Sequence, residues 1–149
     1  MHNLSFSVTL NPTTLWVVGG YDTDCEHLNS TEFVTLDHPS AVGPELPFTL
    51  KGHSMVKFDN NTIFIIGGYQ DGEISNKTWI IDANNGFKIR VGPSLNTKRV
   101  GHSCGKMVSG GKILLVVAGG RKEEKSFLNS VEILDLTSGH GWKFGNFIK

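Results

Sequence analysis

The sequence has no excess of charge of either sign. Its 149 residues include 14 Lys and Arg and 14 Asp and Glu, so the formal net charge is zero. A nucleic-acid-binding protein needs a basic surplus to displace counterions from phosphates, and attachment to an anionic membrane needs a polybasic segment. The charge balance therefore predicts neither a nucleic-acid partner nor a membrane partner.

Cysteine and long apolar runs are scarce. Cys25 and Cys104 are too few for a disulfide framework and follow no zinc-binding spacing. The N-terminus lacks the features of a signal peptide, and the longest apolar run, 113–118, is too short to cross a bilayer. These absences favour a cytoplasmic protein. A secreted origin stays open because of four N-x-S/T sequons, which begin at Asn3, Asn29, Asn60 and Asn76.

Glycine is abundant, and its positions repeat. Three apolar runs each end in a glycine doublet, and the doublets are spaced 48 and 52 residues apart. They are Gly19-Gly20, Gly67-Gly68 and Gly119-Gly120. The tripeptide Gly-His-Ser at 52–54 returns 49 residues later at 101–103, and Gly-Pro at 43–44 returns at 92–93. The sequence therefore contains three repeats, with approximate bounds 4–50, 51–99 and 100–149.

Each repeat predicts four short strands and no helix. The second strand is the Val/Ile/Leu run before the doublet, whose continuous apolar character is typical of a strand buried on both faces. First strands are predicted at 6–10, 54–58 and 103–108, and third strands at 32–36, 78–82 and 131–136. Fourth strands are predicted near 87–91 and 142–144, and none can be placed in the first repeat.

A repeat of this length, with four strands and a glycine doublet after the second, resembles the kelch repeat of β-propellers. The resemblance covers 6–144 and includes His53 and His102 before the first strand, Arg99, and Trp142 on the fourth strand. It implies an all-β fold, with residues 1–149 forming three four-stranded antiparallel blades of a kelch-type β-propeller. Propellers close with about four to eight blades, so we expect a partial ring. The chain is then a fragment, or a second copy completes the ring by self-association.

The sequence offers no catalytic or metal-binding motif. It contains no HExxH, GxSxG or P-loop pattern, and the glycine doublets follow a strand without opening a helix. His53 and His102 occupy equivalent repeat positions, so a structural role is expected for them, as for the six doublet glycines and Trp142. We therefore expect no enzyme, no cofactor and no metal.

The loops after the second strands differ in sequence while the framework repeats, as is typical of a binding surface. They span 21–28, 69–75 and 121–128, and they begin with tyrosine or arginine, residue types common in binding hot spots. The candidate partner-binding residues are Tyr21, Asp22, Lys51, Tyr69, Gln70, Arg99, Arg121 and Lys122. Two alternatives stay open: the tyrosines could cover the blade edge, and Arg99 could hold the next blade.

We expect a non-enzymatic scaffold that binds a protein partner through these loops. The resemblance implies substrate recognition in a ubiquitin ligase or actin binding, as in many kelch proteins. One alternative is a fragment of a kelch-propeller oxidase, whose copper ligands include Tyr and His beside a Cys–Tyr cross-link. Tyr21, Tyr69 and Cys25 are present, but no His stands at a companion position. The other is an extracellular recognition module, which the sequons favour.

Overall fold

In residues 5–145 the regular secondary structure consists of strands only. The computed structural model describes residues 5–145, and all of its strand pairs are antiparallel. This confirms the predicted all-β class. Within residues 5–145 there is no helix that could cross a membrane.

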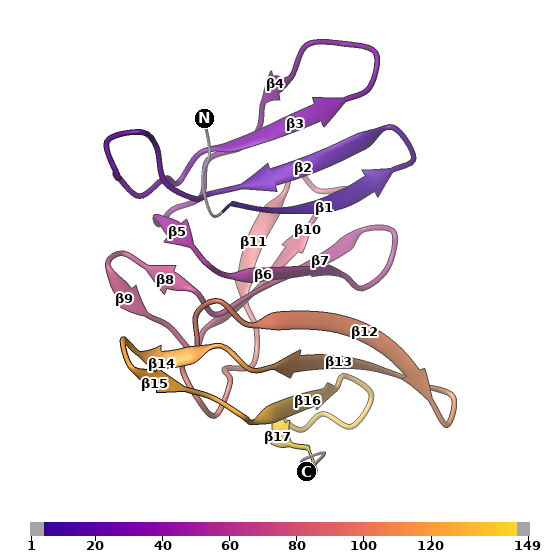
Figure 1. Cartoon of the computed structure of the whole chain (residues 1–149). Helices are drawn as coiled ribbons and strands as arrows, with labels where there is room; N and C mark the ends of the chain where they lie inside the picture. Colours follow the sequence, from indigo (N-terminus) through magenta and orange to yellow (C-terminus); the bar gives the residue numbers. More distant parts are fainter. Residues whose placement is uncertain (1–4, 146–149) are drawn as a thin grey trace.

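Three four-stranded sheets follow one another along the chain, each with its strands in sequence order (Figure 1). Sheet I contains β1 (Phe6–Asn11), β2 (Thr14–Val18), β3 (Thr31–Thr35) and β4 (Ala41–Val42). Sheet II contains β6 (Ser54–Lys57), β7 (Thr62–Ile66), β10 (Thr78–Asp82) and β11 (Lys88–Val91). Sheet III contains β12 (Ser103–Ser109), β13 (Lys112–Ala118), β16 (Val131–Asp135) and β17 (Lys143–Phe144). The predicted first, third and fourth strands agree within one residue at either end, and β4 is the fourth strand that the sequence did not locate.

Two of the segments expected as loops contain small β-hairpins. Strand β8 (Tyr69–Gln70) pairs with β9 (Glu73–Ile74) on one side and with β5 (Leu50–Lys51) on the other, and β14 (Arg121–Glu123) pairs with β15 (Ser126–Phe127). The connection between β8 and β9 is Asp71-Gly72, and both residues have positive φ, 49° and 88°. An Asp-Gly pair in this conformation is a typical hairpin turn. The sequence could therefore have predicted this hairpin, but the segment was expected as a loop.

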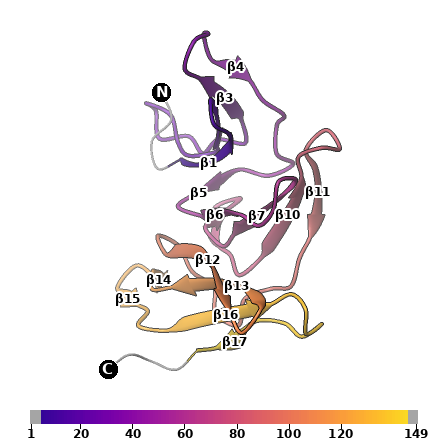
Figure 2. The same ribbon diagram turned by 90° about the vertical axis from the view of Figure 1, so that its right-hand side faces the viewer.

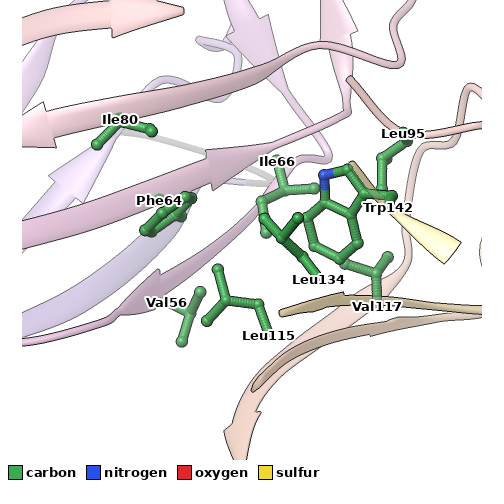
Figure 3. Close-up of a cluster of buried hydrophobic side chains, with 9 residues drawn as sticks. All are labelled: Val56, Phe64, Ile66, Ile80, Leu95, Leu115, Val117, Leu134 and Trp142. Carbon is green, nitrogen blue, oxygen red and sulfur yellow. The ribbon is translucent and has the colours of Figure 1, made fainter. Parts of the chain in front are cut away.

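The core lies in two layers, because the strand alternation of β7 sends successive side chains to opposite faces of sheet II. Ile63 and Ile65 pack with Trp16 of sheet I, whereas Phe64 and Ile66 pack toward sheet III. Figure 3 shows the layer between sheets II and III, where sheet III contributes Leu115, Val117 and Leu134, and Trp142 joins them from just before β17.

The prediction that the second strands are buried on both faces is confirmed for β7, but it is wrong for β2 and β13. Among the described residues, only sheet II has a neighbouring sheet on each side. In β2 and β13 buried residues alternate with more exposed ones, and Leu15 of β2 is 40% exposed. Residue type therefore predicted the strands, but the position of each sheet among the three decided how many faces are covered.

The first two of the three glycine doublets stand where one sheet is joined to the next. All six glycines have positive φ, a conformation that costs glycine little. At Gly67 an added Cβ would lie 2.7 Å from the Arg99 carbonyl oxygen and 2.8 Å from Cε1 of His102. The linker between sheets II and III therefore passes too close for any side chain. In the same place, Gly68 N–H donates to the Arg99 carbonyl over 2.8 Å.

The first strands of the three sheets contact each other, with β6 between β1 and β12 (Figure 2). Two lysines at equivalent repeat positions join them. Lys57 Nζ donates to the carbonyl oxygen of Leu10, and Lys106 Nζ donates to that of Phe58 over 2.7 Å. This repeated contact was not foreseen, although the recurrence of lysine three residues after each Gly-His-Ser serine could have indicated it.

Candidate functional site

The candidate loops gather on one side of the molecule. The loop 21–28 and the hairpins β8–β9 and β14–β15 lie at the left of Figure 1, away from the turns that join the first and second strands. Each leaves its sheet directly after a glycine doublet. The repeat therefore places the loop 21–28 and the two hairpins on one surface, which is called the hairpin surface below.

Three predicted residues meet at the centre of this surface. Lys51 Nζ lies 5.7 Å from the ring centroid of Tyr21 and 5.4 Å from that of Tyr69, which are cation–π contacts. Lys51 on β5 is the register partner of Tyr69 on β8, and this pairing fixes its backbone. The His27 ring stands edge-on to Tyr69 with centroids 6.4 Å apart. Sequence reasoning assigned His27 no role, because its contact comes from another repeat.

A groove of about 430 Å³ runs beside this cluster, between the two hairpins. Tyr69 and Ile74 give it an apolar portion, and charged side chains of both signs line the rest. The lining residues are Tyr69, Gly72, Glu73, Ile74, Lys98, Lys122, Glu123 and Glu124. The structure thus brings two predicted residues, Tyr69 and Lys122, to one groove.

The side chains of Asp22 and Gln70 accept hydrogen bonds from other residues of their own repeats. The Asp22 carboxylate accepts hydrogen bonds from the backbone N–H groups of Asp24 and Glu26, over 3.0 and 2.9 Å. The Gln70 side-chain oxygen accepts one from Nε1 of Trp79 over 3.4 Å. The Asp22 contacts hold the backbone of the loop 21–28, and the Gln70 contact joins β8 to β10.

Arg121 holds the third hairpin to the preceding linker. It forms a β-bridge with Val100, and its guanidinium donates to the Glu124 carbonyl oxygen over 3.3 Å. The side chain of Arg121 is half-buried. It therefore supports the β14–β15 hairpin, whose first strand carries Lys122.

Arg99 lies away from the hairpin surface, in the interior. Its guanidinium pairs with Glu132 at 2.6 Å, and both side chains are 0% exposed. It also donates to the Gly119 carbonyl oxygen over 2.9 Å. Burial favours the interpretation in which Arg99 holds the next repeat over the one in which it binds a partner.

The Glu132 carboxylate also accepts hydrogen bonds from the linker between sheets II and III. It accepts from the backbone N–H groups of Asn96 and Thr97, over 2.7 and 3.1 Å. It also accepts from the Asn96 side-chain amide over 2.9 Å. Sequence reasoning missed Glu132, because nothing local distinguishes it from a surface glutamate.

The two repeat histidines are buried between sheets. Burial lowers the pKa of His53 to about 3, and burial together with Arg99 lowers that of His102 to about 4. Both imidazoles are therefore neutral near pH 7. Within residues 5–145 the ring nitrogens of His53 have no hydrogen-bond partner. Trp142 is buried as well, and its Nε1 donates to the Pro93 carbonyl oxygen over 2.9 Å.

No metal site is formed by the described part of the chain, since no group of three or more His, Cys, Asp and Glu side chains comes together in residues 5–145. Cys25 and Cys104 are both free thiols, the first exposed and the second half-buried. Burial raises the pKa of Cys104, which disfavours its thiolate.

Two of the sequon asparagines make equivalent structural contacts. The side-chain amide of Asn29 donates to the Leu46 carbonyl oxygen over 3.3 Å, and that of Asn76 donates to Leu95 over 3.0 Å. These contacts account for the recurrence of asparagine at this point of the repeat. Asn3 lies outside the described residues.

In comparisons with known proteins, no protein-family model matches this sequence, and no curated protein matches it either.

Proposed function

We propose that the chain forms three blades of a kelch-type β-propeller and serves as a non-enzymatic scaffold that binds a protein partner on the hairpin surface. The observation that carries the binding proposal is the cluster of Tyr21, Lys51 and Tyr69 beside an open groove of about 430 Å³. Aromatic residues that are partly buried and held by neighbours lose little freedom on binding, which favours them as hot spots.

The blade proposal is supported by contacts that recur at the repeat spacing. Gly20 N–H donates to the Leu50 carbonyl oxygen as Gly68 N–H donates to that of Arg99. The asparagine contacts to the linkers and the lysine contacts between first strands recur in the same way. Each four-stranded sheet therefore meets its neighbour through the same set of interactions, as stacked blades do.

The groove suggests the chemistry of the partner. Tyr69 and Ile74 offer apolar contact, and Lys98 and Lys122 offer cations at its sides. A peptide segment with an apolar residue next to an acidic one would satisfy both. Such a segment fits either partner class that the kelch resemblance implies, a ubiquitin-ligase substrate or actin.

The test places a photo-crosslinking amino acid at position 122, in the groove, and in a second protein at position 88. Lys88 is the matched control, because it is exposed and pairs with Asp82 at the end of sheet II away from Gly67. We expect a partner to be captured from 122 and not from 88. Actin filaments are the first purified probe.

The captured partner is then purified and its affinity measured for the wild type and for Tyr69→Ala. Loss of a hot-spot aromatic weakens binding about tenfold or more, while circular dichroism keeps its β signal. Capture from 88 alone, or unchanged affinity of Tyr69→Ala, would refute the hairpin surface as the binding site.

A further inference from the structure

Sheets I and III each carry an apolar face that no other described element covers. On sheet I this face contains Leu15, Val17, Val34 and Val42, with Leu15 40% and Val42 88% exposed, and the register places Glu32 on the same face between Val17 and Val42. A hollow of about 260 Å³ lies over Leu15 and Val34. On sheet III the face contains Met107, Leu114, Val116 and Ile133, with Met107 48% exposed, and the register also places Asp135 beside Leu114 and Lys143 beside Ile133. These sets are called the open face of sheet I and the open face of sheet III.

The repeat shows what each open face is built to contact. When the glycine doublets are aligned, Val116 takes the position of Trp16 and Phe64, and Leu15 takes that of Ile63 and Leu115. Trp16 packs in one cluster with Ile63, and Phe64 packs in one cluster with Leu115. The same pair of faces therefore meets twice inside the molecule. The open face of sheet III is complementary to the open face of sheet I.

A backbone site beside sheet III follows the same pattern. At the first junction the linker residue Leu50 accepts from Gly20 N–H over 2.7 Å and donates to the Leu28 carbonyl oxygen over 2.9 Å. The equivalent groups in the third repeat are Gly120 N–H and the Leu128 carbonyl oxygen. They line a pocket of about 390 Å³ together with Val100, Gly101, Arg121 and Phe127.

The glycine beside this pocket has room that its equivalent lacks. An added Cβ on Gly119 would lie 3.8 Å from its nearest neighbour, whereas at Gly67 the distance to the linker is 2.7 Å. Phe127 is 81% exposed at the pocket rim. The pocket therefore has the width and the hydrogen-bonding groups to take an extended linker strand.

We propose that a second copy of this chain covers these surfaces, in a head-to-tail pair. The open face of sheet I in each copy packs on the open face of sheet III in the other. Two equivalent contacts close the assembly, as in other cyclic dimers.

The closed pair contains six four-stranded sheets, within the range of about four to eight blades seen in propellers. This count rests on the proposed propeller architecture, whereas the head-to-tail contact rests on the packing of the repeat alone. The association is independent of the hairpin surface, so its failure and failure of partner binding are separate results.

The test measures mass in solution by light scattering and native mass spectrometry. The wild type is expected at about 33 kDa, twice the 16.3 kDa of one chain. Leu15→Lys and Val116→Glu should each give a monomer with unchanged circular dichroism, because a charge then lies in both contacts of the pair. Val91→Glu is the matched control, since Val91 is 64% exposed and lies on neither open face.

Mixing the two variants decides the orientation. One contact in the mixed pair is then wild type, and the other opposes lysine and glutamate, so a heterodimer of about 33 kDa should form. A wild-type monomer, single variants that remain paired, or a mixture that stays monomeric would overturn the proposal.

Discussion

Replacing Arg99 with alanine removes the cation that faces Glu132 in the interior. Both side chains are fully buried and 2.6 Å apart. Glu132 would keep its three donors from Asn96 and Thr97 but would lose the opposite charge. An uncompensated buried charge lowers the free energy of unfolding by about 3–5 kcal/mol. This is a large part of the total, since domains unfold with about 5–15 kcal/mol.

The neighbouring residue supplies the control. Lys98→Ala removes a cation one position earlier in the same linker, but Lys98 is exposed. Its substitution should change the free energy of unfolding by no more than about 0.5 kcal/mol. The pair therefore separates the effect of burial from the effect of removing a positive charge.

A double variant tests whether the uncompensated charge of Glu132 causes the loss of stability in Arg99→Ala. Arg99→Met with Glu132→Leu removes both charges, but it leaves the backbone N–H groups of Asn96 and Thr97 without their acceptor. Asn96 is exposed and Thr97 is half-buried, so water can replace the lost acceptor and each group costs less than the about 1–3 kcal/mol of a fully buried one. We expect the double variant to be less stable than the wild type but more stable than Arg99→Ala.

Urea denaturation followed by tryptophan fluorescence measures these differences, with the slope m as a check that the same surface unfolds. The reasoning would be refuted if Arg99→Ala stayed within about 1 kcal/mol of the wild type. If Arg99→Ala instead abolished partner capture at unchanged stability, the binding interpretation of this residue would return.

Further predictions concern pH and the glycines. His53 and His102 have folded-state pKa values of about 3 and about 4, against 6.5 in the unfolded chain. As the pH falls from 7 to 5 the unfolded state gains protons that the folded state does not. Stability therefore decreases by up to about 1.4 kcal/mol per pH unit for each histidine; urea midpoints that stay constant over this range would contradict it. Gly119→Ala should cost about 1 kcal/mol for its left-handed backbone, and Gly67→Ala clearly more because of the linker contact; equal melting temperatures would argue against that contact.

The linker between sheets II and III shows why part of the site was not predictable. Lys98 and Arg99 are adjacent cations of one loop, and the sequence does not indicate which of the two side chains is buried. In an extended segment successive side chains point to opposite sides, so one is exposed and lines the groove while the other is buried. Glu132, which fixes Arg99, is 33 residues away in the sequence.

Part of the hairpin surface was predictable, because it depends on local repeat positions and not on contacts between distant residues. Tyr21, Tyr69 and Arg121 each follow a glycine doublet, so the repeat alone assigned them to equivalent positions. Their placement around Lys51 was not evident, because it depends on the pairing of β5 with β8 across a repeat boundary.

The sequence by itself determined the local structure of this protein. The glycine doublets, the apolar runs before them and the polar turns set the strands and the order of each sheet, because these features act over a few residues. The tertiary structure decided which faces are covered, which of two adjacent cations is buried, and which apolar faces of sheets I and III remain open. Those outcomes depend on the number of neighbouring sheets, and residue type does not encode that number.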